Sequence, residues 1–214
     1  MDKNKIRIRS KYELEIRKKE FLESCKILEK LKINYFLVSG ILLGAVRDKK
    51  LISWDWDIEL SLFSDVLEKK LSIIENELIK KKFTIIKINR KKNQLKIDYF
   101  GKLDQTVTCY SIESWSYSKK RKVFWRNSYQ IPEKFLKKFS KVKLFGKYFN
   151  CPKNPEKFLE FLYGDWKKPL RTFNKNEYIS KGFINRKRLY LDKTIMIIKK
   201  IAYKIINIHK FLLK

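Results

Sequence analysis

Acidic residues occupy alternate positions in residues 54–60, WDWDIEL. Successive side chains of a β-strand point to opposite faces, so Asp55, Asp57 and Glu59 would share one face. Neighbouring carboxylates repel one another, and burying an unpaired anion is costly. The acidic face is therefore either solvated or occupied by divalent cations, and both interpretations are open from this stretch alone. The opposite face is expected to pack Trp54, Trp56, Ile58 and Leu60.

Asp98 is a further candidate metal ligand. It is an isolated acid among apolar residues in the segment LKIDYF, which predicts a separate strand. Beside the first acidic strand it would supply another carboxylate for two cations about 3.5–4 Å apart. Mg²⁺ prefers such hard oxygen ligands and keeps positions open for phosphate oxygens. Alone, Asp98 would more simply pair with one of the many lysines.

The segment SGILLGAVRD, residues 39–48, predicts a phosphate-binding turn. Ser39 and Gly40 would form a tight turn into a helix, whose first N–H groups are free to bind an anion. Arg47 adds a planar donor fork suited to phosphate. Most Ser-Gly turns bind nothing, but turn, helix and acidic strand in this order favour a phosphate site facing a metal site.

Composition excludes several kinds of chemistry. The single histidine, His209, lies near the end of the chain, which excludes Ser-His-Asp and Cys-His catalysis from its body. Cys25, Cys109 and Cys151 form no CxxC pair, so neither a zinc site nor a disulfide framework is indicated. No signal peptide and no apolar run of about 18 residues is present, which favours a cytoplasmic body.

The chain carries 52 Lys and Arg against 23 Asp and Glu, a formal charge of +29. Such a charge suggests a polyanionic partner or an anionic membrane. The cations are mostly lysines spread along the whole chain, so the excess is weak evidence for either partner.

Hydrophobic periodicity predicts one α+β domain, a mixed β-sheet backed by helices. The expected helices cover about residues 10–32, 41–48, 64–82 (capped by Ser64) and 154–164. The expected strands cover residues 34–40, 56–62, 83–88, 95–100 and 107–112.

With these motifs placed, residues 39–62 resemble the signature of the LicD/fukutin family of phosphotransferases. That signature is roughly Gly-Thr-Leu-Leu-Gly, Arg, a basic turn, and Trp-Asp-x-Asp-hydrophobic-Asp. Residues 144–169 are similar to the family's closing segment, which ends a helix in Tyr-Gly-Asp-Trp. The likeness runs from about residue 10 to 175. It implies a catalytic domain with a polymerase-β-type nucleotidyltransferase fold over residues 1–180.

The resemblance also implies an activity and its residues. Members are taken to transfer phosphocholine, ribitol phosphate or a similar group from a CDP-activated donor to a sugar hydroxyl, releasing CMP. Asp57 and Glu59 would be the metal-binding pair for Mg²⁺ or Mn²⁺, with Asp55 as the preceding acid and Asp98 as the third carboxylate. The donor-binding positions would be Ser39, Gly40, Gly44 and Arg47. This chain departs from the signature at Ile41 (usually Thr) and at Glu59 (usually Asp).

Two other functions fit parts of the sequence. A true nucleotidyltransferase would place the nucleotide on the acceptor instead of releasing CMP. A basic nucleic-acid-binding module would suit the charge, but an acidic strand repels phosphate unless metal is bound, so nucleic acid is not the expected partner. The expected partners are a CDP-linked donor and a glycan acceptor, free or lipid-linked.

Three segments leave alternatives open. Residues 184–214, within a tail of 181–214, carry apolar residues at helical spacing with interleaved lysines. Such a helix would either lie on an anionic membrane at the inner face of the cell membrane or dock on protein. The aromatic, basic residues 115–129 would either grip a ligand or form a strand and loop. Tyr163, Asp165 and Trp166 would either reach the site or simply end a helix.

Overall fold

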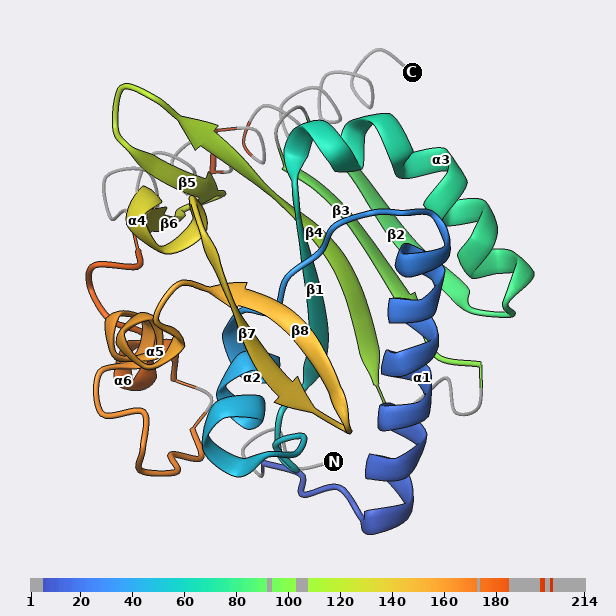
Figure 1. Cartoon of the computed structure of the whole chain (residues 1–214), viewed down its shortest axis with the longest axis horizontal. Coiled ribbons are helices and arrows are strands. Elements are labelled where there is room, and N and C mark those ends of the chain that lie inside the picture. Colours follow the sequence, from blue (N-terminus) through green and yellow to red (C-terminus); the bar gives the residue numbers. More distant parts are fainter. Residues whose placement is uncertain are drawn as a thin grey trace, which may run out of the picture.

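The computed structural model describes residues 6–91, 94–102, 108–172, 174–184, 197, 198 and 201. It is an α+β fold, as predicted, in which helices cover one face of a mixed sheet (Figure 1). The predicted tail helix lies outside the described residues, apart from Ile197, Ile198 and Ile201. Among the helices that the structure describes, none combines the length and the apolar character needed to cross a bilayer.

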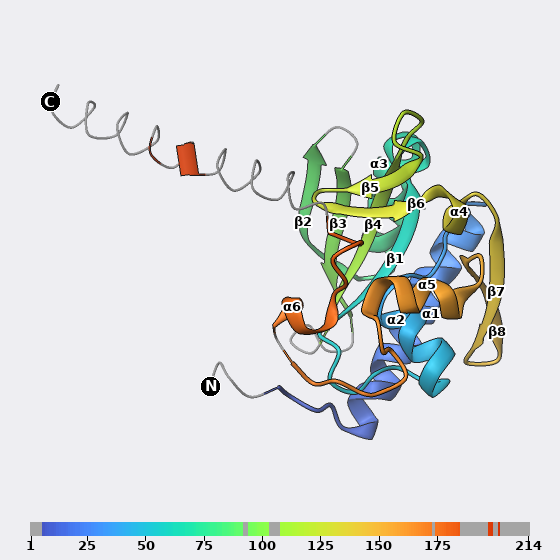
Figure 2. The ribbon, with the colours of Figure 1, turned by 90° about the vertical axis from the view of Figure 1, so that its left-hand side faces the viewer.

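The long strand β4 (Cys109–Ser118) organises the main sheet. Strand β1 (Asp57–Phe63) lies parallel to β4, and β3 (Gln94–Phe100) lies antiparallel on its other side. Strand β2 (Thr84–Lys91) pairs with β3 at the edge. The hairpin of β5 (Val123–Arg126) and β6 (Tyr129–Pro132) pairs with the last residues of β4. Figure 2 shows this hairpin running across the end of β3 and β4.

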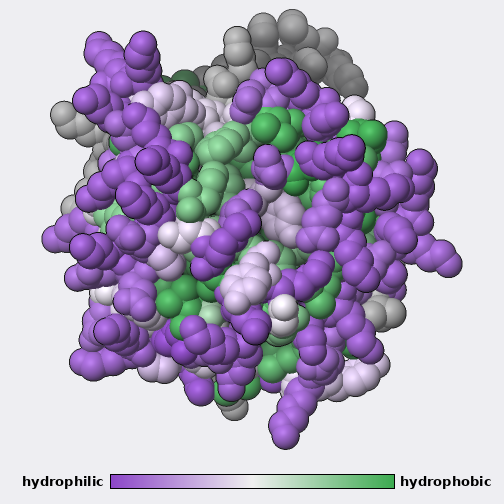
Figure 3. All heavy atoms as spheres, in the orientation of Figure 1, coloured by the Kyte–Doolittle hydropathy of each residue, from purple (hydrophilic) through white to green (hydrophobic). Residues whose placement is uncertain are grey.

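One face of the sheet is apolar and forms the core. Helices α1 (Lys11–Lys30) and α3 (Ser64–Lys80) lie side by side over it (Figure 1). Tyr99 and Tyr110 of this face stack at 5.6 Å, and the hydroxyl of Tyr99 donates to Ser24 of α1 at 2.9 Å. Alternation then sends the neighbouring residues of β1, β3 and β4 to the opposite, polar face. Hydrophilic side chains cover much of the surface that is seen in the orientation of Figure 1 (Figure 3).

The buried residues 35–38 lead into helix α2 (Ser39–Leu43), which continues as one π-helical turn, η1 (Gly44–Asp48). A hairpin of β7 (Phe139–Leu144) and β8 (Lys147–Pro152) packs beside α1. The ring centroids of Phe149 in β8 and Phe21 in α1 are 5.5 Å apart. The remaining helices are α4 (Glu133–Leu136), α5 (Pro155–Tyr163) and α6 (Lys175–Tyr178). Residues 181–184 close on the same body, since Gln130 N donates to Phe183 O at 2.8 Å.

Two local predictions differ from the structure. Residues 34–40 form no strand, because their backbone bonds alternate between partners: Phe36 pairs with Ser61 of β1, whereas Leu37 N donates to Asn150 O of β8. Ser64 does not cap α3. It is the first residue of that helix, and its hydroxyl lies 2.6 Å from the hydroxyl of Ser116 instead.

Candidate active site

A cavity of about 1080 Å³ opens beside the start of β1. It lies between α2, β1, α5 and the chain that follows α5. Six of the predicted site residues line it: Ser39, Gly40, Arg47, Asp55, Asp57 and Glu59. Tyr163, Asp165 and Trp166, whose role the sequence left open, line it too. One cavity is therefore lined by the acidic strand, by the Ser-Gly turn and by the residues at the end of α5.

The sheet register places Asp98 on the polar face with the other carboxylates, but further away. Glu59 is paired with Ser111 of β4, and Ser111 is paired in turn with Asp98 of β3. Paired residues of neighbouring strands point to the same face, so Glu59 and Asp98 share it with β4 between them. Asp98 is not among the residues that line the cavity. Its Oδ1 lies 2.9 Å from Nζ of Lys96, which does line it.

Two carboxyl groups at the cavity are strongly perturbed. Burial, with Glu59 and Asp55 close by, raises the pKa of Asp57 to about 7. Burial also raises the pKa of Asp55 to about 6, although Arg17 opposes this shift. Carboxylates perturbed in this way by burial and by neighbouring acids are common at functional sites.

These carboxylates suit a hard divalent cation in their chemistry. Within the described residues, no three His, Cys, Asp or Glu side chains form a ready-made metal cage. Mg²⁺ seldom needs one, because one or two carboxylates, water and substrate phosphates usually complete its shell. Asp55, Asp57 and Glu59 are therefore the residues that would hold such an ion at this cavity.

Asp55 lies directly against the start of α2. A β-carbon built on Gly40 would be 1.9 Å from Asp55 Oδ2, so only glycine leaves room for this carboxylate. Ser39 before it adopts a left-handed conformation with φ of 54°, which is uncommon for a residue other than glycine. The predicted phosphate turn is therefore in contact with the acidic segment itself.

Arg47 already has partners for its donor fork. Its Nε and Nη2 each donate to the carboxylate of Asp48 at 2.8 Å, and Nη1 donates to the carbonyl of Trp166 at 3.3 Å. In this structure Arg47 joins the turn after α2 to the segment after α5. Any phosphate bound there would have to share the fork with Asp48.

Gly44 is buried and is not among the residues that line the cavity. A β-carbon at this position would lie 2.5 Å from the carbonyl oxygen of Lys50. The structure thus gives Gly44 a packing role, in which its missing side chain lets the turn after η1 approach closely.

Trp56 does not pack on the apolar face as predicted. Strand β1 begins only at Asp57, so the alternation expected from residue 54 does not apply at Trp56, and the indole is 72% exposed. Both Trp54 and Trp56 line the cavity instead. The guanidinium of Arg171 lies 4.8 Å from the Trp54 ring, in a cation–π contact.

Sequence reasoning missed a group of charged and aromatic residues around the carboxylates. Arg126 donates to Glu113, and its Nη2 lies 3.9 Å from Glu59. Glu113 is completely buried on the polar face of β4, in direct contact with this cation. Lys96 and Tyr129 complete the group at the cavity wall.

Part of this group could have been suspected. Arg126 and Tyr129 fall in the aromatic, basic stretch 115–129, which forms the end of β4 and a hairpin and also reaches the cavity. Tyr163 sits near the acidic group: burial, with Asp55 and Glu59 nearby, raises its pKa well above the ordinary value. Its phenol therefore stays a neutral hydrogen-bond donor.

Comparison with known proteins identifies the family of the chain. One solved structure, that of the antibiotic-resistance factor ANT(2'')-Ia, matches with a TM-score of 0.43 and 9% identity. That match covers 63% of this chain and 63% of the other, a likeness too distant to support an assignment. No curated protein sequence matches. The family model described as "LicD/FKTN/FKRP, nucleotidyltransferase domain" matches residues 32–154, more than half of the chain. The chain therefore belongs to the LicD family.

Proposed function

We propose that this protein transfers a phospho-substituent from a CDP-linked donor to a sugar hydroxyl of a cell-surface or lipid-linked glycan. Membership of the LicD family supports a transferase that modifies glycans. The observation that carries the finer proposal is the meeting of Asp55, Asp57 and Glu59 at a cavity large enough for a nucleotide-sized ligand.

Mg²⁺ or Mn²⁺ would be held by Asp55, Asp57 and Glu59, and would neutralise charge on the donor diphosphate and on departing CMP. The raised pKa values of Asp55 and Asp57 support this role, because a cation would relieve the repulsion that causes part of the shift. Lys96 and Arg126 stand beside these carboxylates as fixed positive charges. They would orient phosphate oxygens and keep the acids in place.

The transfer itself needs one proton acceptor. The sugar hydroxyl oxygen bonds to the phosphorus of the transferred group, the bond from that phosphorus to the CMP oxygen breaks, and the hydroxyl proton leaves. We assign the proton to Asp98, which shares the polar face with Glu59 across β4. This role requires Lys96 to release Asp98 when substrate binds, since the two are paired in this structure.

A nucleotidyltransferase is the second candidate, because the matching family model is described as a nucleotidyltransferase domain. Incubation with CDP-choline, CDP-ribitol or CDP-glycerol, a glycan acceptor and Mg²⁺ separates the two. The proposal expects free CMP and a phospho-substituted glycan. A glycan carrying the nucleotide would favour the second candidate, and no turnover of any donor with either metal would argue against both.

We further propose that residues 184–214 hold the protein at an anionic membrane surface, where a lipid-linked acceptor would be found. The support is the basic amphipathic pattern of the segment. Co-sedimentation with anionic liposomes, with and without residues 184–214, tests it. Equal binding of both forms would remove the tail from this role.

A further inference from the structure

Two arginines outside the family match bind the backbone of the acidic segment. Arg9 precedes α1 and Arg17 lies within it, whereas the family match begins at residue 32. Both donate to the carbonyl oxygen of Asp55, Arg17 at 3.0 Å. Arg9 also donates to the carbonyl of Trp56 at 3.1 Å, and Arg17 to that of Asp57 at 3.3 Å. Three successive carbonyls are thus held by two side chains.

These carbonyls need such partners. Strand β1 begins at Asp57, so the two residues before it have no place in the sheet ladder. A buried carbonyl without a hydrogen bond is costly, and an irregular segment would otherwise turn it toward water. The arginines therefore supply hydrogen-bond donors to the carbonyls of residues 55 and 56, as the neighbouring strand β4 does within β1.

Burying the two guanidinium groups costs free energy, which indicates that their contacts with the acidic segment have a specific role. Arg17 is 1% exposed, and burial lowers the pKa of its guanidinium. Burial lowers the pKa of Arg9 to about 10, so Arg9 is still a cation at neutral pH. A buried cation is usually tolerated only with close partners. Here both arginines donate to backbone carbonyls of the acidic segment.

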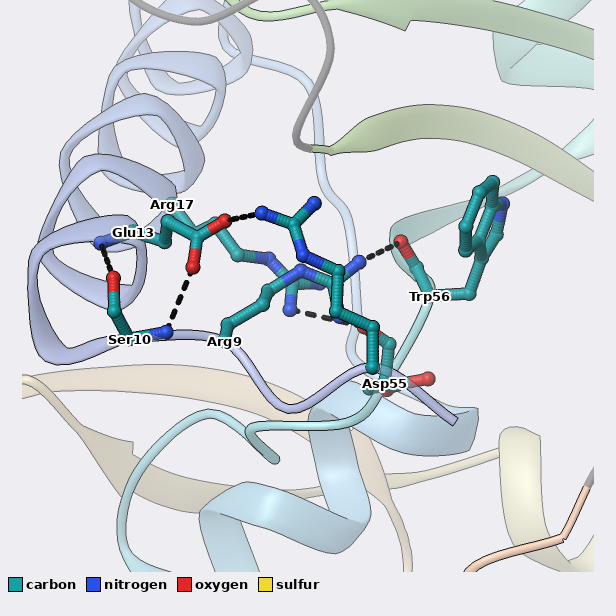
Figure 4. Close-up of polar contacts among 7 residues, drawn as sticks. Arg9, Ser10, Glu13, Arg17, Asp55 and Trp56 are labelled. Carbon is teal, nitrogen blue, oxygen red and sulfur yellow. Dashed lines mark hydrogen bonds and ion pairs between the residues drawn. The ribbon is translucent and has the colours of Figure 1, made fainter. Parts of the chain in front are cut away.

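The segment just before α1 is itself held in place, so the arginines act from a fixed position. Ser10 caps α1 through the N–H of Glu13, while Glu13 accepts from the N–H of Ser10 at 2.7 Å. Arg9 N donates to the carbonyl of Ser53 at 2.9 Å, which adds a backbone link to the acidic segment. Figure 4 shows this cap beside the two arginines, with the Trp56 side chain pointing away from them.

The backbone carbonyls and the side chains of residues 55–57 face different parts of the protein. Arg17 comes from α1, which covers the apolar face of the sheet, whereas the side chain of Asp57 belongs to the polar face. The side chains of Asp55, Trp56 and Asp57 all line the cavity. Holding the carbonyls from the apolar side therefore leaves both carboxylates directed at the cavity.

We propose that Arg9 and Arg17 are positioning residues: they clamp the backbone of residues 55–57 and so set the direction of the Asp55 and Asp57 carboxylates. The consequence for metal binding rests on the proposed function, but the clamp itself does not. A lysine in place of Arg17 keeps the charge but cannot bridge two carbonyls with one planar fork, so it separates charge from geometry.

The test compares Arg17→Lys, Arg17→Met and Arg9→Met with the wild type. The control is Arg7→Met, which removes an exposed guanidinium that pairs with Glu13. Amide hydrogen exchange followed by mass spectrometry is measured without metal or substrate. We expect at least tenfold faster exchange in peptides covering residues 53–57 of the Arg17 variants, with peptides of β7 and β8 unchanged. Unchanged exchange at residues 53–57 would overturn the clamp.

Binding of Mn²⁺ is then measured by electron paramagnetic resonance on the same folded proteins, well below their unfolding temperatures. We expect at least tenfold weaker binding in Arg17→Lys and Arg17→Met, and wild-type binding in Arg7→Met. Faster local exchange with a wild-type Kd would show that the clamp does not position the carboxylates, and would overturn that role. Failure of the wild type to bind Mn²⁺ would instead count against the proposed function, while the exchange data still decide the clamp.

Discussion

The carboxylate of Asp55 packs against the backbone of Gly40, so that a β-carbon on Gly40 would lie 1.9 Å from Asp55 Oδ2. Gly40→Ala must therefore displace either the turn or the carboxylate. We expect release of CMP from the CDP-linked donor to fall about 100-fold, the order of loss that follows a misplacement of about 1 Å. Gly146→Asn is the control, since Gly146 has positive φ and open space around it and Asn tolerates that conformation. Equal activity of Gly40→Ala and wild type would contradict the prediction.

Replacement of Asp57 should separate activity from stability. Asp57→Asn removes one of the crowded, buried carboxylates while keeping its shape, so the metal-free protein is expected to become more stable by about 1 kcal/mol or more. Turnover with Mg²⁺ is expected to fall at least 1000-fold, as when an essential group is removed. Urea unfolding and CMP release measure the two effects, and Glu15→Gln, which changes an exposed acid on α1, serves as the control. A variant that keeps wild-type turnover would refute the role of Asp57.

The raised pKa values predict how stability depends on pH. In the folded protein Asp55 and Asp57 bind protons up to about pH 6 and 7, whereas in the unfolded chain both release them near the ordinary value of 3.8. Between these limits the folded state holds more protons, so the free energy of unfolding falls as pH rises from about 4 to 7. Each pKa unit corresponds to about 1.4 kcal/mol.

The experiment is urea unfolding in EDTA at pH 5 and pH 8. The wild type is expected to lose a few kcal/mol more than a double variant Asp55→Asn/Asp57→Asn between these values. Added Mn²⁺ should stabilise the wild type more at pH 8, where both carboxylates are ionised and can bind it. Parallel pH profiles for the wild type and the double variant would contradict the prediction.

The sequence predicted the parts of the fold that depend on local pattern. Alternation placed Asp57 and Glu59 on one face of β1, and helical spacing placed α1, α3 and α5 within a few residues of their observed bounds. It did not predict that Trp56 is exposed, because alternation holds only inside a strand. The first residue of β1 accepts a hydrogen bond from Arg17, which lies 40 residues earlier in the chain, and sequence spacing does not reveal such a contact.

The site residues that the sequence did not reveal also depend on contacts between segments far apart in the chain. Glu113 lies just beyond the strand predicted at residues 107–112, and its burial beside Arg126 depends on the folding back of β5. Spacing shows that Lys96 shares a strand face with Asp98, but not that the pairing of β3 with β4 brings Lys96 to the cavity. Sequence spacing shows which residues share a strand face, but not which strands become neighbours.

Trp56 offers a large exposed aromatic surface between the two perturbed carboxylates. Such a ring is suited to stacking against a base or a sugar, a contact worth about 1–3 kcal/mol for nucleobases. We expect Trp56→Ala to raise the KM of one substrate by about tenfold, with little change in kcat and in the unfolding midpoint. Steady-state kinetics with donor and acceptor varied in turn show which substrate is affected. Tyr148→Ala removes an equally exposed ring from β8, outside the cavity lining, and should leave both KM values unchanged.

The pair of Arg126 and Glu113 should behave as a buried ion pair. Glu113 is fully enclosed, and Arg126 is 11% exposed with its ring contacts to Trp115 and Tyr129 at 5.2 and 5.8 Å. Arg126→Leu leaves the carboxylates of Glu113 and Glu59 without their cation, so unfolding should become easier by about 3–5 kcal/mol. The double variant Arg126→Leu/Glu113→Leu removes both buried charges and should recover most of that loss. Thermal and urea unfolding of the single and double variants, with the exposed Arg121→Leu as control, measure the coupling. A double variant no more stable than Arg126→Leu alone would show that Arg126 stabilises the fold through its aromatic contacts and not through Glu113.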